Sequence, residues 1–432
     1  MAEIFPFRGI RYNQSLINDL SAVICPPYDI INPQAEAELR GRSKYNFIRL
    51  EMPRDTAEDK YTHAAAILER WLEQDVLKPD RKPAVYLYDH CFSCQGKEYT
   101  RRSIITSVRL EGWDKGVVRP HEGILTRPKD DRLKLLGALK ANTSPILTLF
   151  EDCGRQIASV LAEAEQKQPA VTLSSADGES HSIRPVTEKR IINRISACLA
   201  DWPLYIADGH HRYESALAYR RERRAAASSV SGDEPFNFVM MALTDFADPG
   251  LIVLPPHRLV RGISRADLGR LLDKLKVFFA VKTLPLNKPD VWQRVDKLLS
   301  EESDRICLAL FGLAADKIHV LQLRDLTAAS RMMPHFHSEL YQWLDVCIVD
   351  HVILENMLGV DSDSGRQDLT YSCSRQDAVD SVLDGEYQLA FLLRPVKPKV
   401  IKAFADAGDR MPRKSTYFYP KLPSGLILRR LV

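Results

Sequence analysis

A short apolar run that ends in a polar, glycine-containing turn is the segment of this chain best suited to chemistry. Residues 204–207 read Leu-Tyr-Ile-Ala, the turn 208–212 reads Asp-Gly-His-His-Arg, and a helical pattern follows at once. A strand–turn–helix unit of this kind directs the first-turn N–H groups of the helix, and the positive end of its dipole, toward the turn. Such a position favours an anion, most often a phosphate.

Two residue types in this turn suit a phosphate. Gly209 lets a ligand approach the backbone closely, and Arg212 can hold a phosphate by two parallel hydrogen bonds. Two adjacent histidines are hard to explain as packing. The alternative interpretation is an ordinary helix start with Asp208 as its N-cap, and the local pattern does not decide between the two. The phosphate-binding residues that we expect are Asp208, Gly209, His210, His211 and Arg212.

A second segment suits acid–base chemistry. Residues 117–120 read as a strand that delivers His121 and Glu122 into a turn. Asp130 and Asp131 follow shortly after, and they either hold Mg²⁺ through water or cap the next helix, with capping the better explanation for at least one of them. We expect catalytic roles for His121 and Glu122.

Three further polar turns abut strands, and each could meet a small anionic substrate. They are Asn142–Pro145, Pro255–Arg258 and Lys414–Thr416, the last beside an aromatic run. Taken alone, each is also an ordinary turn, which is the favoured interpretation on the local pattern. Cys91 and Cys94 form one Cys-x-x-Cys pair with no second pair at zinc-ribbon spacing, so metal or redox duty is not expected there.

The elements that must position these residues alternate between helical and strand patterns. We predict strands at 84–88, 103–108, 145–150, 182–185, 236–243, 305–311, 318–323 and 387–393, with a hairpin turn at 95–97. We predict helices at 61–72, 132–141, 154–166, 188–199, 266–279, 289–300 and 338–357. The connections are too irregular for a doubly wound sheet, which indicates an α+β protein.

Composition limits the class of function. The chain has 432 residues and a formal net charge of only +3, so no strong global field recruits nucleic acid or a membrane. The N-terminus lacks the basic and apolar regions of a signal peptide, and no run approaches the roughly 20 apolar residues that span a bilayer. Eight scattered cysteines then indicate reduced thiols and a cytoplasmic protein.

Several motifs, in order along nearly the whole chain, together resemble the bacterial family catalogued as domain of unknown function 1015. They are Cys25-Pro26-Pro27-Tyr28-Asp29, Arg119-Pro120-His121-Glu122 with Asp131-Arg132, the 207–214 segment, Asp248-Pro249-Gly250-Leu251, Pro256-His257-Arg258 and Met411 to Phe418. The middle of that family resembles the ParB/sulfiredoxin fold, in which a related box binds nucleotide phosphates at a helix N-terminus. Free-serine kinases carry a similar Pro-His-Glu segment upstream of the same box.

The resemblance implies a function and a set of roles. It makes Glu122 the base that activates an acceptor hydroxyl, and it makes 208–212 the phosphate cradle, with Mg²⁺ held by Asp208 and Asp131. An amino-acid substrate also needs a carboxylate receptor. The substrate-binding residues that we expect are His257, Arg258, Lys414, Ser415 and Thr416.

The resemblance also implies an organisation in three parts. These are an N-terminal α/β region (1–110), a ParB/sulfiredoxin-like nucleotide-binding core (111–260) and a C-terminal α/β region (261–432) that contributes to the substrate cleft. Because a base and a phosphate cradle must face one substrate, we expect Glu122 and the 208–212 turn to line one cleft.

The leading hypothesis is a cytoplasmic small-molecule kinase. It would move a phosphoryl group from ATP or ADP, with Mg²⁺, to a small hydroxylated metabolite, for which free L-serine is the best guess. The alternative is a non-catalytic ParB-like nucleotide-binding switch. The near-neutral charge and the lack of a helix-turn-helix pattern weigh against nucleic acid as a partner. No membrane partner is expected, and the oligomeric state is open, a homodimer among the options.

Overall fold

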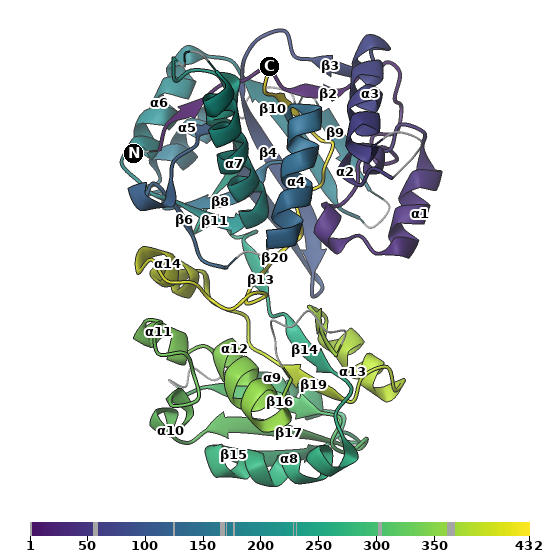
Figure 1. The fold of residues 1–432 in the computed structure, drawn as a ribbon, viewed down its shortest axis with the longest axis vertical. Coiled ribbons are helices and arrows are strands. Elements are labelled where there is room, and N and C mark those ends of the chain that lie inside the picture. Colours follow the sequence, from purple (N-terminus) through teal and green to yellow (C-terminus); the bar gives the residue numbers. More distant parts are fainter. Residues whose placement is uncertain are drawn as a thin grey trace. The chain divides into compact units, whose positions relative to one another are not determined.

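A computed structural model describes residues 2–54, 59–123, 126–164, 169, 171–175, 178–227, 229, 231–300, 305–360 and 368–432. The chain forms two compact units (Figure 1). Unit 1 comprises Met1–Pro120, Ile124–Ile252 and Phe418–Val432, and unit 2 comprises His121–Gly123 and Val253–Tyr417. The chain therefore passes between the units several times, and residues remote in sequence share a unit.

Unit 1 is built on a large mixed sheet, which has nine strands among the described residues. In spatial order these are β6 (Val118–Pro120), β11 (Leu204–Asp208), β8 (Ile146–Phe150), β12 (Phe238–Asp245), β5 (Lys97–Arg109), β4 (Val85–Cys94), β10 (Ser180–Val186) and β9 (Val171–Ser174), with β1 (Ile4–Phe5) pairing β5. The pairs β6–β11 and β8–β12 are parallel and the others antiparallel. Strands β8 and β12 are buried almost throughout, which fits sequences that are mostly apolar.

Helices α5 (Gln156–Ala164), α6 (Lys189–Ala200) and α7 (His210–Ala226) bury apolar residues in the core beside this sheet. Helices α1 (Pro33–Arg42), α2 (Ile48–Glu51) and α3 (Lys60–Glu73) instead contact one another in series, and α3 contacts α4 (Thr126–Leu139). Helix α6 shows the cause of the burial clearly, because isoleucines 191, 192 and 195 recur on one face and lie in the core. Helices α4 and α7 lie side by side (Figure 1), so the helix after the 208–212 turn is in contact with α4.

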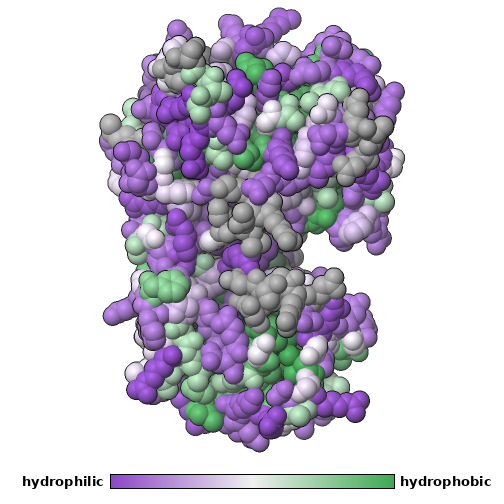
Figure 2. Space-filling model, viewed as in Figure 1, coloured by the Kyte–Doolittle hydropathy of each residue, from purple (hydrophilic) through white to green (hydrophobic). Residues whose placement is uncertain are grey.

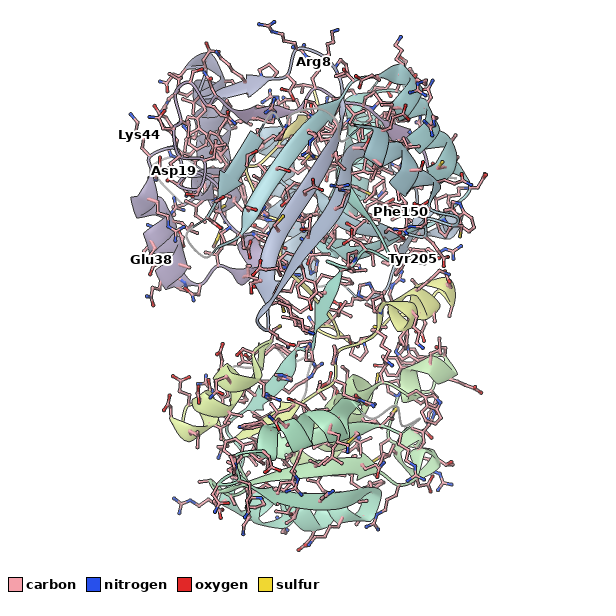
Figure 3. The ribbon with its side chains drawn as sticks, turned by 180° about the vertical axis from the view of Figure 1, so that it is seen from behind. Arg8, Asp19, Glu38, Lys44, Phe150 and Tyr205 are labelled. Atoms are coloured by element: carbon pink, nitrogen blue, oxygen red, sulfur yellow. The ribbon has the colours of Figure 1, made fainter. Side chains whose placement is uncertain are left out.

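Short strand pairs complete unit 1. Strand β2 (Ile10–Tyr12) pairs β3 (Leu77–Pro79), and β7 (Ala141–Asn142) pairs β21 (Arg429–Arg430). The β7–β21 pairing places the C-terminal segment beside the stretch that precedes β8. Figure 3 shows the same sheet from behind and labels Phe150 in β8 and Tyr205 in β11. These strands are antiparallel neighbours, so β11 ends at the turn and β8 begins beside it.

Unit 2 contains an antiparallel sheet, which has six strands among the described residues. Their order is β15 (Phe279–Pro285), β17 (Lys317–Leu323), β16 (Cys307–Phe311), β19 (Leu389–Leu392), β14 (His257–Val260) and β18 (Leu369–Ser372). The helices are α8 (Arg265–Phe278), α9 (Val291–Ser300), α10 (Leu326–Ser330), α11 (Glu339–Gln342), α12 (Asp345–Cys347), α13 (Arg375–Leu383), α14 (Pro398–Asp406) and a π-helix over Ile348–Met357. Strands β13 (Ile252–Leu254) and β20 (Tyr417–Tyr419) contain crossings between units.

The mixture of helices and sheets confirms the predicted α+β class. The division of the chain differs from the three predicted regions, because strands from 1–110 and from 111–260 hydrogen-bond in one sheet. Adjacent core strands cannot separate into independent domains without exposing their backbone groups. The ParB/sulfiredoxin-like character of the core stays an expectation from the resemblance.

Most predicted elements occur within a few residues of their predicted bounds. The predicted helix over 338–357 is wrong as a single element, since α11, α12 and the π-helix occupy it. Among the described residues no helix combines the length and the apolar character needed to cross a bilayer. The face shown in Figure 2 is largely hydrophilic, as expected for a chain with 27% charged residues.

Candidate functional site

The 208–212 turn of unit 1 has the geometry of a helix N-terminus that begins at glycine. Strand β11 ends at Asp208, and Gly209 is the N-cap of α7 with φ 99° and ψ 27°. That left-handed conformation favours glycine, and a Cβ atom here would lie 2.9 Å from the guanidinium of Arg212. Because Gly209 occupies the cap, the alternative in which Asp208 caps the helix does not hold. The carboxylate of Asp208 has other partners.

Two cations bind that carboxylate. Arg212 donates from Nη2 to Oδ2 of Asp208 at 2.6 Å, and Lys421 pairs with Oδ1. Burial by itself raises the pKa of Asp208, but the charges of Lys421 and Arg212 outweigh it and hold that pKa well below its usual range. Asp208, Arg212 and Lys421 therefore form a cluster of two cations and one anion at the turn. A polyphosphate would meet this excess positive charge at the N-terminus of a 17-residue helix.

The guanidinium of Arg212 also hydrogen-bonds to the segment directly before β8. Its Nη1 donates to the hydroxyl of Ser144 at 2.9 Å and to the carbonyl of Pro145 at 2.7 Å. The expected bidentate grip on a phosphate would therefore compete with existing partners. His210 is buried and His211 half-buried in the first turn of α7, and a charge on His210 further lowers the pKa of Asp208.

Sequence reasoning missed Lys421. It lies 213 residues from Asp208, and no motif or spacing pointed to it. The structure shows what holds its segment in unit 1: the fully buried Arg101 donates to the carbonyls of Tyr419 at 3.3 Å and Pro420 at 2.9 Å. These bonds fix the backbone immediately before Lys421, which has only 9% of its side chain exposed.

In unit 2 the structure brings together two of the predicted groups that lie about 290 residues apart. Oε1 of Glu122 accepts from the backbone N–H groups of Ser415 at 3.2 Å and Thr416 at 3.1 Å, and from the Thr416 hydroxyl at 3.0 Å. The backbone of Glu122 also forms a bridge with Met411. These contacts fix the position of the carboxylate from three donors.

His121 supports this arrangement from the core of unit 2. Its Nε2 lies 3.0 Å from the Thr416 hydroxyl, which has a single proton and already donates it to Glu122. Nε2 must therefore be the donor, and the chain of bonds runs from His121 through Thr416 to Glu122. His121 is fully buried, so in this structure it orients Thr416 and does not itself face solvent.

The second oxygen of Glu122 has no donor among the described residues. Within the part of the chain that the structure describes, Oε2 accepts no hydrogen bond, and 16% of the side chain is exposed. Lys414 lies next to the anchoring residues, is exposed, and has a left-handed backbone with φ 57°. Ser415 is buried and donates to the carbonyl of Pro412 at 2.6 Å, which closes the turn. Glu122 can thus offer a carboxylate oxygen, and Lys414 is an exposed cation that directly precedes the residues anchoring this carboxylate.

Glu122 belongs to unit 2 and the 208–212 turn to unit 1. The expectation that both line one cleft stays a prediction.

Two predicted substrate-binding residues lie in the core of unit 2. Arg258 has no exposed surface, and its Nε and Nη2 each donate to Asp350 at 3.0 Å. His257 is also buried, and its Nδ1 accepts from the backbone N–H of Leu393 at 3.0 Å. Both side chains are engaged by the protein itself, so their placement counts against a substrate role, and the function proposed below does not use them.

The buried ring of His257 predicts a pH dependence of stability. Burial, followed by the charges of Arg375 and Arg258, lowers the pKa of His257 from 6.5 to about 4. The unfolded chain then takes up the proton first, so the stabilisation is complete above about pH 6.5 and is lost as pH falls toward 4. We expect His257 to remove about 3 kcal/mol of the free energy of unfolding between about pH 7 and pH 4.

Denaturant unfolding of the chain and of His257→Asn at several pH values tests this dependence. Asparagine keeps an acceptor for the Leu393 N–H but takes up no proton, so the pH slope should become shallower. The same change at the exposed His335 should leave the slope unaltered. Equal slopes for the parent and His257→Asn would contradict the assignment.

The predicted magnesium ligands are both bound to cations. Oδ1 of Asp131 accepts from Lys60 at 3.1 Å and Tyr61 at 2.8 Å, and its Oδ2 accepts from Arg132 at 2.5 Å. Burial opposes ionisation, but Arg132 above all lowers the pKa of Asp131 to about 2. Since α4 begins at Thr126, Asp131 is inside the helix and is not its cap. Neither Asp131 nor Asp208 offers a free carboxylate to Mg²⁺, so the residues present do not fit that ion.

Another cluster in unit 1 has ligand types that suit a metal. His90 in β4 and His181 in β10 face each other in register, and one oxygen of Glu179 lies 2.8 Å from Nε2 of His90 and 3.9 Å from Nε2 of His181. However, Arg101 can only donate, and its Nη2 lies 3.2 Å from Nδ1 of His90. The proton of the neutral ring is therefore on Nε2 and is directed at Glu179. This is the pattern of a buried hydrogen-bonded cluster, whereas a metal-bound histidine normally donates from its other nitrogen.

Comparison with known proteins gives one family and several solved structures. A protein-family model described as "Protein of unknown function (DUF1015)" matches residues 4–346. No curated protein matches the chain. A conserved hypothetical protein from Pyrococcus furiosus is similar at 15% identity and a TM-score of 0.34, covering 74% of this chain and 93% of its own. A free serine kinase in complex with AMP is similar at 15% identity and a TM-score of 0.35, covering 72% and 86%. A C-terminally truncated SbnI from Staphylococcus aureus has 8% identity and a TM-score of 0.32, covering 74% and 85%.

Proposed function

Since the chain belongs to the DUF1015 family, whose members are described as proteins of unknown function, we propose from its own residues that it is a phosphotransferase. It moves a phosphoryl group from a nucleotide to a small hydroxylated metabolite, with free L-serine as the favoured acceptor. The observation that carries the proposal is the carboxylate of Glu122, whose Oε1 is fixed by three donors while its Oε2 accepts no hydrogen bond from the described residues. A protein that only binds nucleotide has little use for such a carboxylate.

The acceptor side of the reaction is assigned to unit 2. Oε2 of Glu122 takes the proton of the acceptor hydroxyl. At the same time the oxygen of that hydroxyl forms a bond to phosphorus, and the bond from phosphorus to the departing nucleotide oxygen breaks. The hydrogen bonds from Ser415 and Thr416 hold the carboxylate in one orientation, which a general base requires. Lys414 is the cation that we assign to the carboxylate of an amino-acid acceptor.

The donor side is assigned to the 208–212 turn of unit 1. The helix N-terminus at Gly209 and the cations Arg212 and Lys421 supply fixed positive charge for the phosphates, which is how most of the rate enhancement of phosphoryl transfer arises. No step is assigned to Mg²⁺, because Asp208 and Asp131 both hold cations of the protein.

A donor–acceptor screen tests the proposal. Incubating the purified chain with ATP, ADP, CTP or pyrophosphate and a pool of amino acids and sugars, with and without Mg²⁺, should give a new phosphorylated species by mass spectrometry. We expect O-phosphoserine as the principal product. Binding of nucleotide with no product from any acceptor would overturn the proposal and favour a nucleotide-binding switch.

The two cations at the turn give a prediction for affinity. We expect Arg212→Ala and Lys421→Met each to weaken nucleotide binding by about 1.5–3 kcal/mol, the range for a hydrogen bond to a charged group. Titration calorimetry measures the change, and Lys97→Met, at the exposed turn between β4 and β5, is the matched control. Unchanged affinity in both variants would place the nucleotide elsewhere.

A further inference from the structure

A pocket in unit 1 adjoins the 208–212 turn and contains a buried carboxylate that the proposed reaction does not use. The pocket has about 470 Å³ of space when its open mouth is counted with it. Helix α4, helix α7 and the 141–146 segment line it, and Glu51 from the end of α2 reaches it. Arg212 and Ser144 line the same pocket and also belong to the turn, so the two features are continuous.

Glu51 has one oxygen to which no described residue donates. Its side chain is 2% exposed, and Oε1 lies 3.7 Å from Nη1 of Arg132. Among the described residues nothing hydrogen-bonds to the buried Oε2. A buried carboxylate oxygen without a donor is destabilising, which indicates that a ligand or solvent group donates to it. The α2 segment is the source of this oxygen, so the N-terminal part of the chain shapes the pocket.

Arg132 is the neighbour that holds Glu51 in place. Burial opposes the charge of Arg132, but the charges of Glu51 and Asp131 outweigh it and raise the pKa of Arg132. Arg132 also donates to the backbone carbonyl of Glu51 at 3.0 Å and lies 4.2 Å from the ring centre of Tyr28. A carboxylate held in this way accepts from neutral hydroxyl groups and repels phosphate. The phosphate end of a ligand therefore belongs at Arg212, and its hydroxyl end at Glu51.

The rest of the lining is apolar. Leu135, Leu139, Ile146 and Val239 are buried side chains on the wall of the pocket. Apolar walls that enclose a few polar groups are the usual environment of a planar organic ring in a binding site. A ligand that joins an anionic group, hydroxyl groups and a planar ring would match these three parts of the site, and a nucleotide is such a ligand.

We infer that this pocket is the nucleoside subsite of the donor and that Oε2 of Glu51 accepts from the ribose hydroxyl groups. The inference rests on the proposed function, because it needs the phosphates at the turn. It extends that function by giving the N-terminal region a role in choosing a ribonucleotide. The general chemistry is familiar, since a carboxylate is a good acceptor for a ribose hydroxyl.

Three ligands separate this inference from the proposed function. Calorimetry with the full chain compares ATP, 2′,3′-dideoxy-ATP and inorganic tripolyphosphate. We expect ATP to bind about 10-fold or more tightly than the dideoxy analogue, since a hydrogen bond to a charged acceptor is lost. Glu51→Gln should reduce this ratio and leave the affinity for tripolyphosphate unchanged, while Glu73→Gln, at an exposed carboxylate in α3, should change neither.

Each outcome decides one of the two claims. Equal affinities of the parent chain for ATP and its dideoxy analogue would overturn the inference while leaving phosphate binding at the turn intact, and this comparison needs no variant to fold. The inference would also be overturned if Glu51→Gln, shown to be folded by circular dichroism, had the same ratio of ATP affinity to dideoxy-ATP affinity as the parent chain. Failure of all three ligands to bind would remove the proposed function and the inference with it.

Discussion

Replacement of Glu122 by glutamine is expected to lower phosphoryl transfer about 10²–10⁴-fold, the usual contribution of a positioned general base. Glutamine is nearly isosteric and keeps an oxygen that can accept from Ser415 and Thr416, so the local fold should persist. It cannot take the proton of the acceptor hydroxyl. Nucleotide affinity should be close to that of the parent, because the phosphates are assigned to the 208–212 turn in the other unit.

Single-turnover transfer to serine, measured beside a nucleotide titration, separates a catalytic role from a binding role. Glu386→Gln changes an exposed carboxylate in the same unit and is the matched control, with no expected effect on either quantity. A nucleotide-binding switch would show little turnover in the parent, and the substitution would alter only nucleotide-dependent conformation. Full transfer activity in Glu122→Gln would show that another group accepts the proton.

The local parts of the site could be predicted from sequence because they depend on short stretches of chain. A strand, a glycine and a helix at 204–226 are adjacent in sequence, so the turn geometry follows from residue types alone. The hairpin between β4 and β5 could be predicted for the same reason, because its turn depends on adjacent residues, and Gln95 and Gly96 both take positive φ there. Even here the pattern alone did not show whether Asp208 or Gly209 caps the helix.

Partners that come from far along the chain could not be predicted in this way. The sequence offers no reason why Lys421 should approach Asp208, since the contact depends on Arg101 fixing the backbone before it. Glu122 and Thr416 were each singled out, but their hydrogen bond spans 294 residues and depends on the fold of unit 2. Motifs therefore identified the two residues correctly without showing that one orients the other.

The buried position of Arg258 also could not be predicted from the sequence. A polar turn at 255–258 suggested a surface site, and no local signal indicated that the arginine would be covered by a π-helix carrying its counter-ion. The π-helix itself has the apolar periodicity of an ordinary helix, which is why a single helix over 338–357 was predicted. Burial is a property of the whole fold. Arg258 can therefore be interpreted as a substrate receptor or as part of a buried ion pair, and these two interpretations differ most in what they predict for stability.

Loss of the carboxylate opposite Arg258 is expected to destabilise unit 2 by about 3–5 kcal/mol, the cost of leaving one charge of a buried pair without its partner. Arg258 and Asp350 have 0% and 3% of their side chains exposed, and two hydrogen bonds of 3.0 Å join them. In Asp350→Asn the guanidinium stays buried beside the ring of Tyr371 at 5.2 Å, without a compensating negative charge.

Denaturant unfolding of the full chain measures this effect against a matched pair on the surface of the same unit. Arg375 and Asp296 form an ion pair with 35% and 56% of their side chains exposed, so Asp296→Asn should cost no more than about 1 kcal/mol. Replacing both buried partners, as in Arg258→Met with Asp350→Leu, should recover most of the loss, because neither charge is then left alone. If Asp350→Asn were as mild as Asp296→Asn, Arg258 would be accessible to solvent or to a ligand, and its predicted role as a substrate receptor would stand again.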